Sequence, residues 1–368
     1  MVFCENFRRR IKIDEKEVCL FISGFIKKTK MILTETTSNM NYKLRATANW
    51  VKKPFKKRNF WEKVATLDLA SDKCYVVQPK NPNPPPTMNV WVERFWLLRY
   101  IAPALLIQSL WYHLVPETSY FHTWHPMFAF LFYHIAFVIY TICMAKRLTR
   151  LMDFYGTFDE HNRPRDYIPD KDVHRLIFAV LIYTLARTGG GLILGGYDRY
   201  TPPSLGHTIS WLFPIKIGVW LVALDFFFYS YHRAVHTFPF LWKYHSKHHS
   251  TKHPSIAQAI LADDVQEIIE IFLVPLGASL VVPLTAHEFW IAQCILIYVE
   301  AMGHTGTRAF WTHPCCGEFL QWFGMDLSIE DHDLHHRNGR NGQNFGKQTR
   351  IFDKIFNTID KRIESIQK

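Results

Sequence analysis

Residues 210–231 read SWLFPIKIGVWLVALDFFFYSY, and this apolar run leads without a break into His232 and His236. The run is about as long as the roughly 20 residues that a helix needs to cross the hydrocarbon core of a bilayer. Residues four apart share one face of an α-helix, so His232 and His236 project to the same side where the run ends. The stretch therefore predicts a membrane-spanning helix that carries two imidazoles at its end.

Two more clusters of histidines show the same helical spacing. They are His245, His248 and His249, and then His332, His335 and His336. Neutral imidazole is the commonest protein metal ligand, and it suits iron, zinc and copper alike. A single histidine is more often a surface or core residue, but neither a core nor a solvated surface requires this spacing three times. The histidines therefore predict a metal site without choosing the metal.

Three further apolar runs approach membrane length. They lie at residues 97–115, 126–145 and 174–195. The last run is the weakest, because Arg187 and the three glycines at 189–191 interrupt it. Together with the run before His232, these stretches predict about four transmembrane helices.

A fifth apolar stretch, residues 268–302, is too long for one span and contains Pro275 and Pro283. We expect it to form a helical hairpin that dips into the membrane and returns. The predicted fold is thus an all-α integral membrane protein with about four transmembrane helices, this hairpin and a cytosolic, histidine-rich helical cap. Buried helices of a soluble protein are the alternative, because the overall hydropathy of the chain is near neutral.

The formal net charge of the chain is +11, and many of its cations lie at residues 43–63, between Trp and Phe residues. This composition suits anionic lipid headgroups better than nucleic acid, so no nucleic-acid partner is expected. A second basic stretch, residues 146–150, follows the second apolar run, and the positive-inside rule places both stretches in the cytosol. All three histidine clusters then face the cytosol, and the 196–209 loop faces the opposite side.

Composition divides the chain into three predicted regions. Residues 1–95 form a basic, proline-rich cytosolic region, residues 96–210 a transmembrane region, and residues 211–360 a catalytic domain with the histidine clusters. Residues 1–40 lack a convincing signal peptide and are expected to be poorly ordered or peripheral. The seven cysteines include no CxxC pair, so neither a structural zinc ribbon nor a disulfide-stapled fold is indicated.

The order of the clusters is His-x3-His, His-x2-His-His and, after a long interval, His-x2-His-His again. This order resembles the fatty acid hydroxylase / sterol desaturase superfamily. The flanking residues add to the likeness, which covers about residues 210–360: Arg233, Leu241-Trp242-Lys243-Tyr244, Asn344-Phe345-Gly346-Lys347-Gln348-Thr349-Arg350 and Phe352-Asp353. The resemblance implies a multi-pass membrane enzyme of the endoplasmic reticulum with two iron ions, for which zinc is an alternative isolated form. Such an enzyme uses dioxygen to hydroxylate or desaturate a sterol, a sphingoid base or a fatty acyl chain.

The resemblance also assigns metal ligands, position by position. It assigns the eight histidines of the clusters: His232, His236, His245, His248, His249, His332, His335 and His336. It adds His304, because Gly303-His304-Thr305-Gly306 is similar to a His-Ser-Gly element that supplies a further ligand. His313 is a weaker candidate, and His253 is more consistent with a surface residue or one behind the ligands.

Acidic residues are expected behind the ligands, where they would fix the tautomer of each imidazole. The candidates are Asp225, Glu300, Asp331 and Asp333, each within two helical turns of an assigned histidine. An ordinary helix-end or solvent-exposed charge is the alternative for each of them.

The chain departs from the family pattern after its second cluster. Residues 262–267 read ADDVQE where many members have Ala-x-His-Pro-x-Glu, so Glu267 matches but the His-Pro pair does not. This departure leaves the substrate class open. The sequence contains no His-Pro-Gly-Gly haem motif. We therefore expect the lipid oxidation to draw electrons from a separate donor, cytochrome b5 with an NAD(P)H reductase.

A histidine-rich zinc-binding or metal-transport membrane protein is the alternative function from a different class. A transporter should hold its ligands inside its spans, along a pathway, whereas these histidines lie at or beyond the span ends. An inactive relative that only binds lipid is a third hypothesis, and the complete set of eight cluster histidines argues against it.

Overall fold

A computed structural model of the protein describes residues 48–66, 82–158 and 165–366. These residues contain many helices and no strand beyond three isolated bridges, so the predicted all-α class is confirmed. Residues 1–47, which include the start of the basic stretch, and residues 67–81 lie outside the described residues.

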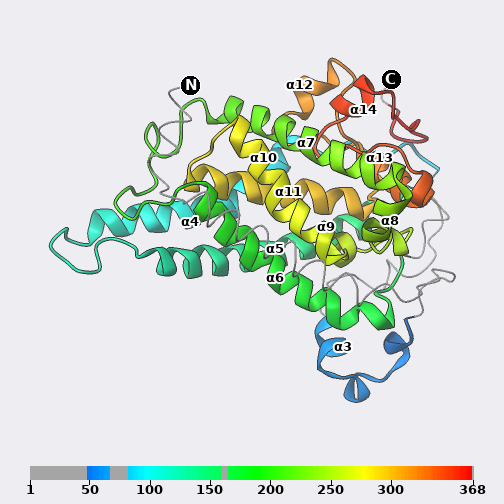
Figure 1. Ribbon diagram of the computed structural model, residues 1–368, viewed down its shortest axis with the longest axis horizontal. Coiled ribbons are helices and arrows are strands. Elements are labelled where there is room, and N and C mark those ends of the chain that lie inside the picture. Colours follow the sequence, from blue (N-terminus) through cyan, green and yellow to red (C-terminus); the bar gives the residue numbers. More distant parts are fainter. Residues whose placement is uncertain (1–47, 67–81, 159–164, 367–368) are drawn as a thin grey trace. The chain divides into compact units, whose positions relative to one another are not determined.

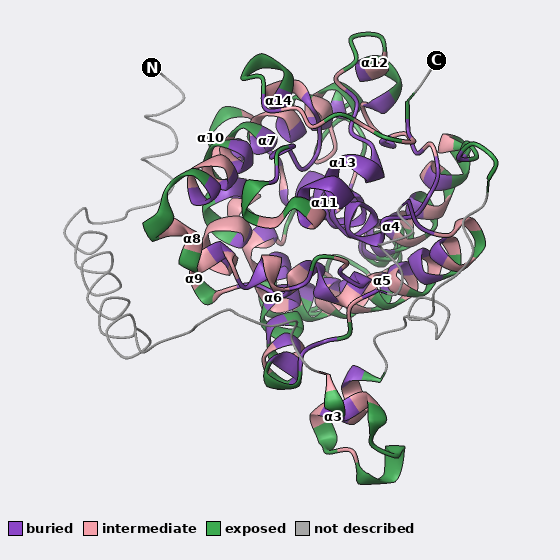
Figure 2. Ribbon diagram, turned by 90° about the vertical axis from the view of Figure 1, so that its right-hand side faces the viewer, coloured by how far each residue is buried: buried purple, intermediate pink, exposed green. Residues whose placement is uncertain are grey.

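Helix α11 (Ala286–Thr305) is the centre of the described unit, and every one of its residues except Ile291 is buried. One apolar cluster joins it to α4 (Val90–Leu114), α5 (Pro126–Tyr155) and α6 (Val173–Leu194). A second cluster joins it to α7 (Phe213–Thr237) and α10 (Val274–Val281). Figures 1 and 2 show α11 enclosed by these helices.

Hydrogen bonds from buried aromatic residues hold α11 against its neighbours. The Tyr140 hydroxyl donates to the Cys294 carbonyl at 2.6 Å, and the Trp290 indole donates to the Ile101 carbonyl at 3.1 Å. Tyr and Trp usually find such partners when they are buried, because an unpaired polar group is costly in an apolar core. These bonds fix the position of α11, and with it the position of His304 near its end.

A helical hairpin occupies the predicted stretch, and its dip into the membrane stays a prediction. Its outgoing limb comprises α9 (Asp264–Ile268), the π-helical η8 (Ile269–Leu273) and α10, and its returning limb is α11. Pro275 lies where the π-helical η8 passes without a break into α10, and Pro283 lies in the connection. Proline has no N–H to donate within this helix, and the Glu270 carbonyl five positions before it accepts from Arg187 at 3.3 Å. Each proline that interrupts the sequence pattern thus stands at an element boundary.

Three described helices are long and apolar enough to cross a membrane: α5, the segment Asp170–Leu194 that contains α6, and α7. This is one fewer than the predicted four. Helix α4 stands at the first predicted run and has 25 residues, but it carries Arg99, Gln108 and His113 among its apolar residues. These polar positions lower its mean hydropathy, which is the physical reason for the difference.

Large apolar side chains cover the outer faces of the long helices. On α5 these include Phe128, Leu131, Ile135 and Ile139, all about half exposed. Contiguous exposed apolar surface of this kind is rare on water-soluble monomers and suits lipid. Figure 2 shows the contrast between these outer helices and the buried α11.

The remaining elements are short. Three short helices come before α4: η1 (Asn49–Lys52), η2 (Phe55–Lys57) and α3 (Phe60–Ala65). Helix α3 packs beside α6, and the Trp50 indole of η1 donates to the Ile168 carbonyl. The others are η5 (Asp170–Asp172), α8 (Pro239–His245), η6 (His248–Ser250), η7 (Ile256–Ile260), α12 (Gly317–Gln321), α13 (Ile329–Asn338), η9 (Gly339–Asn341) and α14 (Ile351–Ile355).

We expect Tyr200 and Arg340 to lie on opposite faces of the membrane, because α7 separates them and is long enough to span. Cysteine or glycosylation reporters at the two positions should label from opposite sides, with Arg340 accessible from the cytosol. Same-side labelling would show that α7 does not cross the bilayer.

Candidate metal centre

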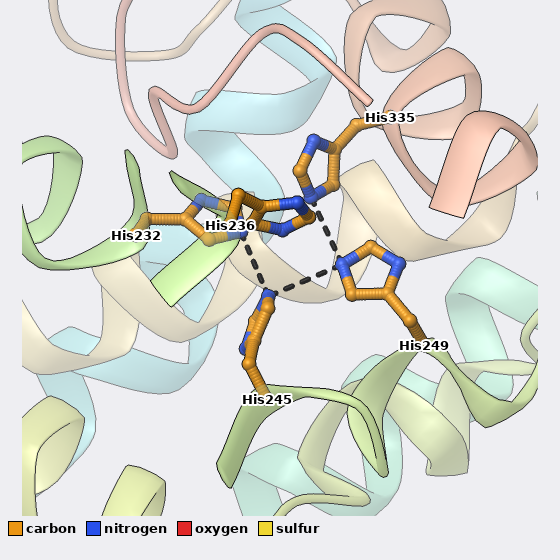
Figure 3. A group of neighbouring side chains, drawn as sticks. All are labelled: His232, His236, His245, His249 and His335. Atoms are coloured by element: carbon orange, nitrogen blue, oxygen red, sulfur yellow. Dashed lines mark hydrogen bonds between the residues drawn. The ribbon is translucent and has the colours of Figure 1, made fainter. Parts of the chain in front are cut away.

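All nine histidines that the sequence assigned as ligands come together in the structure. They form two groups, in each of which one ring nitrogen per residue lies within 4.8 Å of the others. Group 1 is His232, His236, His245, His249 and His335, and group 2 is His248, His304, His332 and His336. Figure 3 shows the five rings of group 1 pointing toward one another from α7, the end of α8, η6 and α13.

The two groups are neighbours because each His-His pair divides between them. In η6, His248 joins group 2 while His249 joins group 1, and in α13 His335 joins group 1 while His336 joins group 2. The ring centroids of His249 and His336 are 4.8 Å apart, across the boundary between the groups. Successive side chains on a helix point about 100° apart, so an adjacent pair can serve two sites at once.

Hydrogen bonds fix the tautomer of most of these rings. The Nδ1–H groups of five rings donate to backbone carbonyls, which can only accept. The pairs are His232 with Phe345 at 2.9 Å, His236 with Arg340 at 3.0 Å, His248 with Leu261 at 3.2 Å, His304 with Glu300 at 2.7 Å and His335 with Gln343 at 2.7 Å. His245 donates in the same way to a side chain, the Oε1 atom of Gln266, at 2.9 Å.

With Nδ1 protonated, each of these neutral rings has a lone pair and no proton on Nε2. The Nε2 atoms nevertheless face one another at close range: 3.0 Å between His232 and His245, and 3.4 Å between His248 and His304. Nε2 of His236 has no hydrogen-bond partner among the described residues. Lone pairs that converge without protons repel, and a cation between them removes the repulsion. The donor set of each group therefore fits a metal ion.

Burial keeps the imidazoles neutral, as metal ligation requires. Eight of the nine rings are buried, and His249 is partly buried. Burial, followed by the nearby Lys347 ammonium, lowers the pKa of His248 to about 4. Burial likewise holds the pKa values of His335 and His336 well below the usual range.

The expected carboxylates do not orient these rings, which corrects the sequence-based interpretation. Glu300 accepts from His304, but through its backbone carbonyl, while its carboxylate pairs with Lys347 at 2.6 Å. Asp331 forms ion pairs with Arg362 and Arg350, and Asp333 forms ion pairs with Arg337 and Arg165. These three acidic residues stabilise the ends of α11 and α13 and their surroundings.

Asp225 acts on the centre indirectly. Its carboxylate accepts from the backbone N–H groups of Lys347 and Gln348, at 2.7 and 2.9 Å, and from the Thr349 hydroxyl at 2.6 Å. Asp225 therefore holds the loop whose Phe345 carbonyl binds His232. Asp225 lies near the centre, as predicted, but its carboxylate binds this loop and not an imidazole.

The two weaker histidine candidates lie outside both groups. His313 is buried and contacts Gln348 Oε1 at 3.3 Å through Nε2, while the backbone N–H of Cys315 donates to its Nδ1. His253 stands in the loop after η6, and its backbone is bonded to Asp166.

Sequence reasoning missed Gln266 and Lys347. Gln266 lies one position before Glu267, the residue that matched the family pattern, and it is the one that contacts His245. Lys347 is buried between the carboxylates of Glu270 and Glu300, at 3.0 and 2.6 Å. Burial opposes its charge, but the two carboxylates outweigh that effect and raise its pKa.

An apolar cavity of about 400 Å³ lies beside group 2. Its walls come from α3, α5, α6, η7 and α11, and most of its lining is aliphatic, including Leu176 and Ile260. Glu300 and Tyr183 are among its few polar lining residues, and Glu300 lies one helical turn before His304. The cavity therefore reaches the close vicinity of the histidines.

Comparisons with known proteins agree with this geometry. Residues 217–358 match the family model described as fatty acid hydroxylase. The fatty acid hydroxylase vlmA of Lecanicillium sp. is 39% identical over 225 residues, which cover 57% of this chain and 60% of that protein. The very-long-chain aldehyde decarbonylase GL1-5 of Oryza sativa subsp. indica is 29% identical over 166 residues, which cover 40% of this chain and 25% of that protein. No solved structure matches the chain significantly.

The metal-free protein should lose stability as the pH falls from about 6.5 to about 4. In that window His248 takes up a proton in the unfolded chain, whose ordinary pKa is 6.5, but not in the folded protein, where its pKa is about 4. Acidification therefore favours unfolding, by roughly 3 kcal/mol for a full shift of this size at one residue. Thermal unfolding of the chelator-treated protein at a series of pH values measures this. A midpoint that does not change across the window would contradict it.

Proposed function

Because the chain belongs to the fatty acid hydroxylase superfamily through residues 217–358, we propose that it is a membrane-bound, non-haem di-iron oxidoreductase. It hydroxylates or desaturates a lipid (a sterol, a sphingoid base or a fatty acyl chain) with dioxygen. The observation that carries the proposal is the convergence of nine imidazoles into two neighbouring groups beside an apolar cavity.

The nine histidines of groups 1 and 2 are the proposed ligands, with one iron ion in each group. Bound iron would supply the activation of dioxygen and the oxidation of an unactivated C–H bond, which no protein side chain can supply. The protein itself positions the metal ligands and the substrate. Its Nδ1 hydrogen bonds aim the lone pairs inward, and the buried site keeps bulk water away from the reacting bond.

The cavity is the proposed site for the apolar part of the substrate. Its aliphatic walls suit a hydrocarbon chain or ring system, and they exclude a strongly polar substrate. Tyr183 and Glu300 are polar lining residues that contact each other, and Glu300 lies one helical turn before His304 of group 2, so they can contact an oxygen-bearing part of the lipid. The substrate would thereby lie with one of its carbons near the histidines.

Metal transport is the less favoured alternative. A transported ion needs ligands along a path, whereas these nine rings converge in two enclosed groups whose tautomers are largely fixed by backbone carbonyls. Residence in the endoplasmic reticulum, a cytochrome b5 with an NAD(P)H reductase as electron donor, and the boundaries 1–95, 96–210 and 211–360 complete the proposal. We propose the electron donor because the sequence contains no His-Pro-Gly-Gly haem motif, and the location because of the family resemblance.

Lipid profiling of cells with and without the protein is the direct test of the function. A lipid that gains a hydroxyl group or a double bond only when the protein is present would identify the product. The purified protein should then consume oxygen with that lipid only when reductase and cytochrome b5 are added. Unchanged lipid profiles and no lipid-dependent oxygen consumption would contradict the proposal.

We predict that the purified protein binds about two metal ions per chain, a number that follows from its two groups of ligands. His248→Ala should lose at least one of them, because His248 provides one of the four rings of group 2. His253→Ala is the matched control, since His253 follows the same η6 turn but lies outside both groups. Metal analysis of the folded proteins decides the matter, and equal metal content in His248→Ala and the wild type would reject the assignment.

We also predict that Ala301→Phe blocks the cavity without removing metal. Ala301 is buried, lines the cavity and lies three positions before His304 on α11, so a phenyl ring there would occupy part of the cavity beside group 2. Lipid-dependent oxygen consumption should fall roughly tenfold or more, because a displaced substrate no longer presents its C–H bond. Full activity at wild-type metal content would show that the substrate binds elsewhere.

A further inference from the structure

His245 differs from the other oriented rings of the metal centre in one respect. The five others whose Nδ1 partner is defined donate to backbone carbonyls, whereas His245 donates to the Gln266 side chain. A backbone carbonyl can only accept a hydrogen bond. A side-chain amide can present either an acceptor or a donor, because its oxygen and nitrogen exchange places when it turns over. The tautomer of His245 therefore depends on the orientation of Gln266.

A second side chain fixes that orientation. The Gln266 amide nitrogen donates to Glu270 Oε1 at 2.7 Å, while its amide oxygen accepts from His245 Nδ1 at 2.9 Å. If the amide turned over, its oxygen would face the Glu270 carboxylate and its NH2 group would face Nδ1 of His245. The first contact would place two hydrogen-bond acceptors next to each other, where they repel, so the Glu270 carboxylate disfavours this orientation of the Gln266 amide.

Lys347 in turn holds the Glu270 carboxylate. Its ammonium lies 3.0 Å from Glu270 Oε2 and 2.6 Å from Glu300 Oε1, and all three side chains are largely buried. Direct contacts thus lead from the buried Lys347 ammonium through Glu270 and Gln266 to the His245 ring of group 1. Glu300, the second carboxylate that contacts Lys347, also has the backbone carbonyl that orients His304 in group 2.

We propose that Glu270 and Gln266 are positioning residues that hold His245 in the tautomer with a free Nε2 lone pair, and that Lys347 anchors this pair to the part of the chain that orients group 2. The inference rests on the proposed metal centre. An imidazole with its proton on Nε2 cannot ligate through that atom, so the amide orientation decides whether group 1 has all five of its ligands.

Four variants of the full-length protein in nanodiscs test the inference. Gln266→Leu removes the acceptor for His245, and Glu270→Gln removes the carboxylate that orients the amide. The double variant Gln266→Glu/Glu270→Gln exchanges the two side-chain types, keeps the net charge and places a carboxylate, which can only accept, beside His245. The control is Asp264→Asn in α9, which makes the same charge change at an exposed residue paired with Arg175.

The readouts are iron per chain, the rate of iron loss to a chelator and the Mössbauer spectrum after loading with ⁵⁷Fe(II). Gln266→Leu and Glu270→Gln should weaken iron binding at one of two sites by roughly 10- to 100-fold, the range found when groups behind metal ligands are removed. The spectrum of that site should change while the other site keeps its signal, which also shows that the fold is intact. The double variant should restore both sites, and Asp264→Asn should match the wild type.

Wild-type iron affinity and spectra in both single variants would overturn the inference while leaving the two-metal centre in place. Iron loss in Glu270→Gln without recovery in the double variant would also overturn it, because the role of Glu270 would then be general stability. A wild-type protein that binds no metal would instead reject the proposed function itself. The failures of the two proposals are therefore distinguishable.

Discussion

The hydrogen bond from Nδ1–H to an outward acceptor is the interaction on which the metal centre depends. It commits the one proton of a neutral imidazole away from the centre, so the Nε2 lone pairs must converge. Burial reinforces this, because it keeps the rings of His335 and His336 uncharged. Without a cation, the close approach of these lone pairs would oppose folding of the centre, and metal binding and folding are expected to be coupled.

This requirement explains the irregular backbone around the site. Most helix carbonyls accept from the N–H groups of their own helix, and His304 alone of the five rings bonded to backbone carbonyls uses one of them, that of Glu300 in α11. The acceptors for His232, His236 and His335 come instead from residues 340–345, between α13 and α14. The loop is held in turn by two carboxylates: Asp225 binds its N–H groups at 347–348, and Asp353 binds those of Phe345 and Gly346. A Cβ at Gly346 would approach the Thr349 carbonyl to 2.2 Å, so only glycine fits this close contact.

Helix α11 connects the metal centre with the cavity. One of its faces lines the cavity at Ile297, Glu300 and Ala301, and His304 follows one turn later in group 2. Because α11 is buried almost throughout and pinned by Tyr140 and Trp290, the distance between cavity and histidines is set by a rigid element. Sites built on rigid elements hold their geometry better than sites built on loops.

Sequence alone determined the features that depend on local periodicity. The four-residue spacings correctly placed His232 with His236 on one face of α7, and His332 with His336 on one face of α13. The common face predicted for the second cluster is wrong, because His245 ends α8 and His248 and His249 lie in η6. The family resemblance added His304, and all nine residues meet in the structure. Run lengths and prolines likewise predicted the hairpin and the long helices, although polar residues in α4 left three helices of spanning character instead of four.

Only the tertiary structure decided how the rings divide and what orients them. Helix geometry turns adjacent rings apart, but the group that each ring of the pairs His248–His249 and His335–His336 joins depends on how η6, α11 and α13 pack, which no local pattern encodes. The acceptors are mostly backbone carbonyls, and every residue has one, so they leave no signature in the sequence. Lys347 meets Glu270 across 77 positions for the same reason: long-range side-chain contacts arise from packing, and helical spacing carries no information about them.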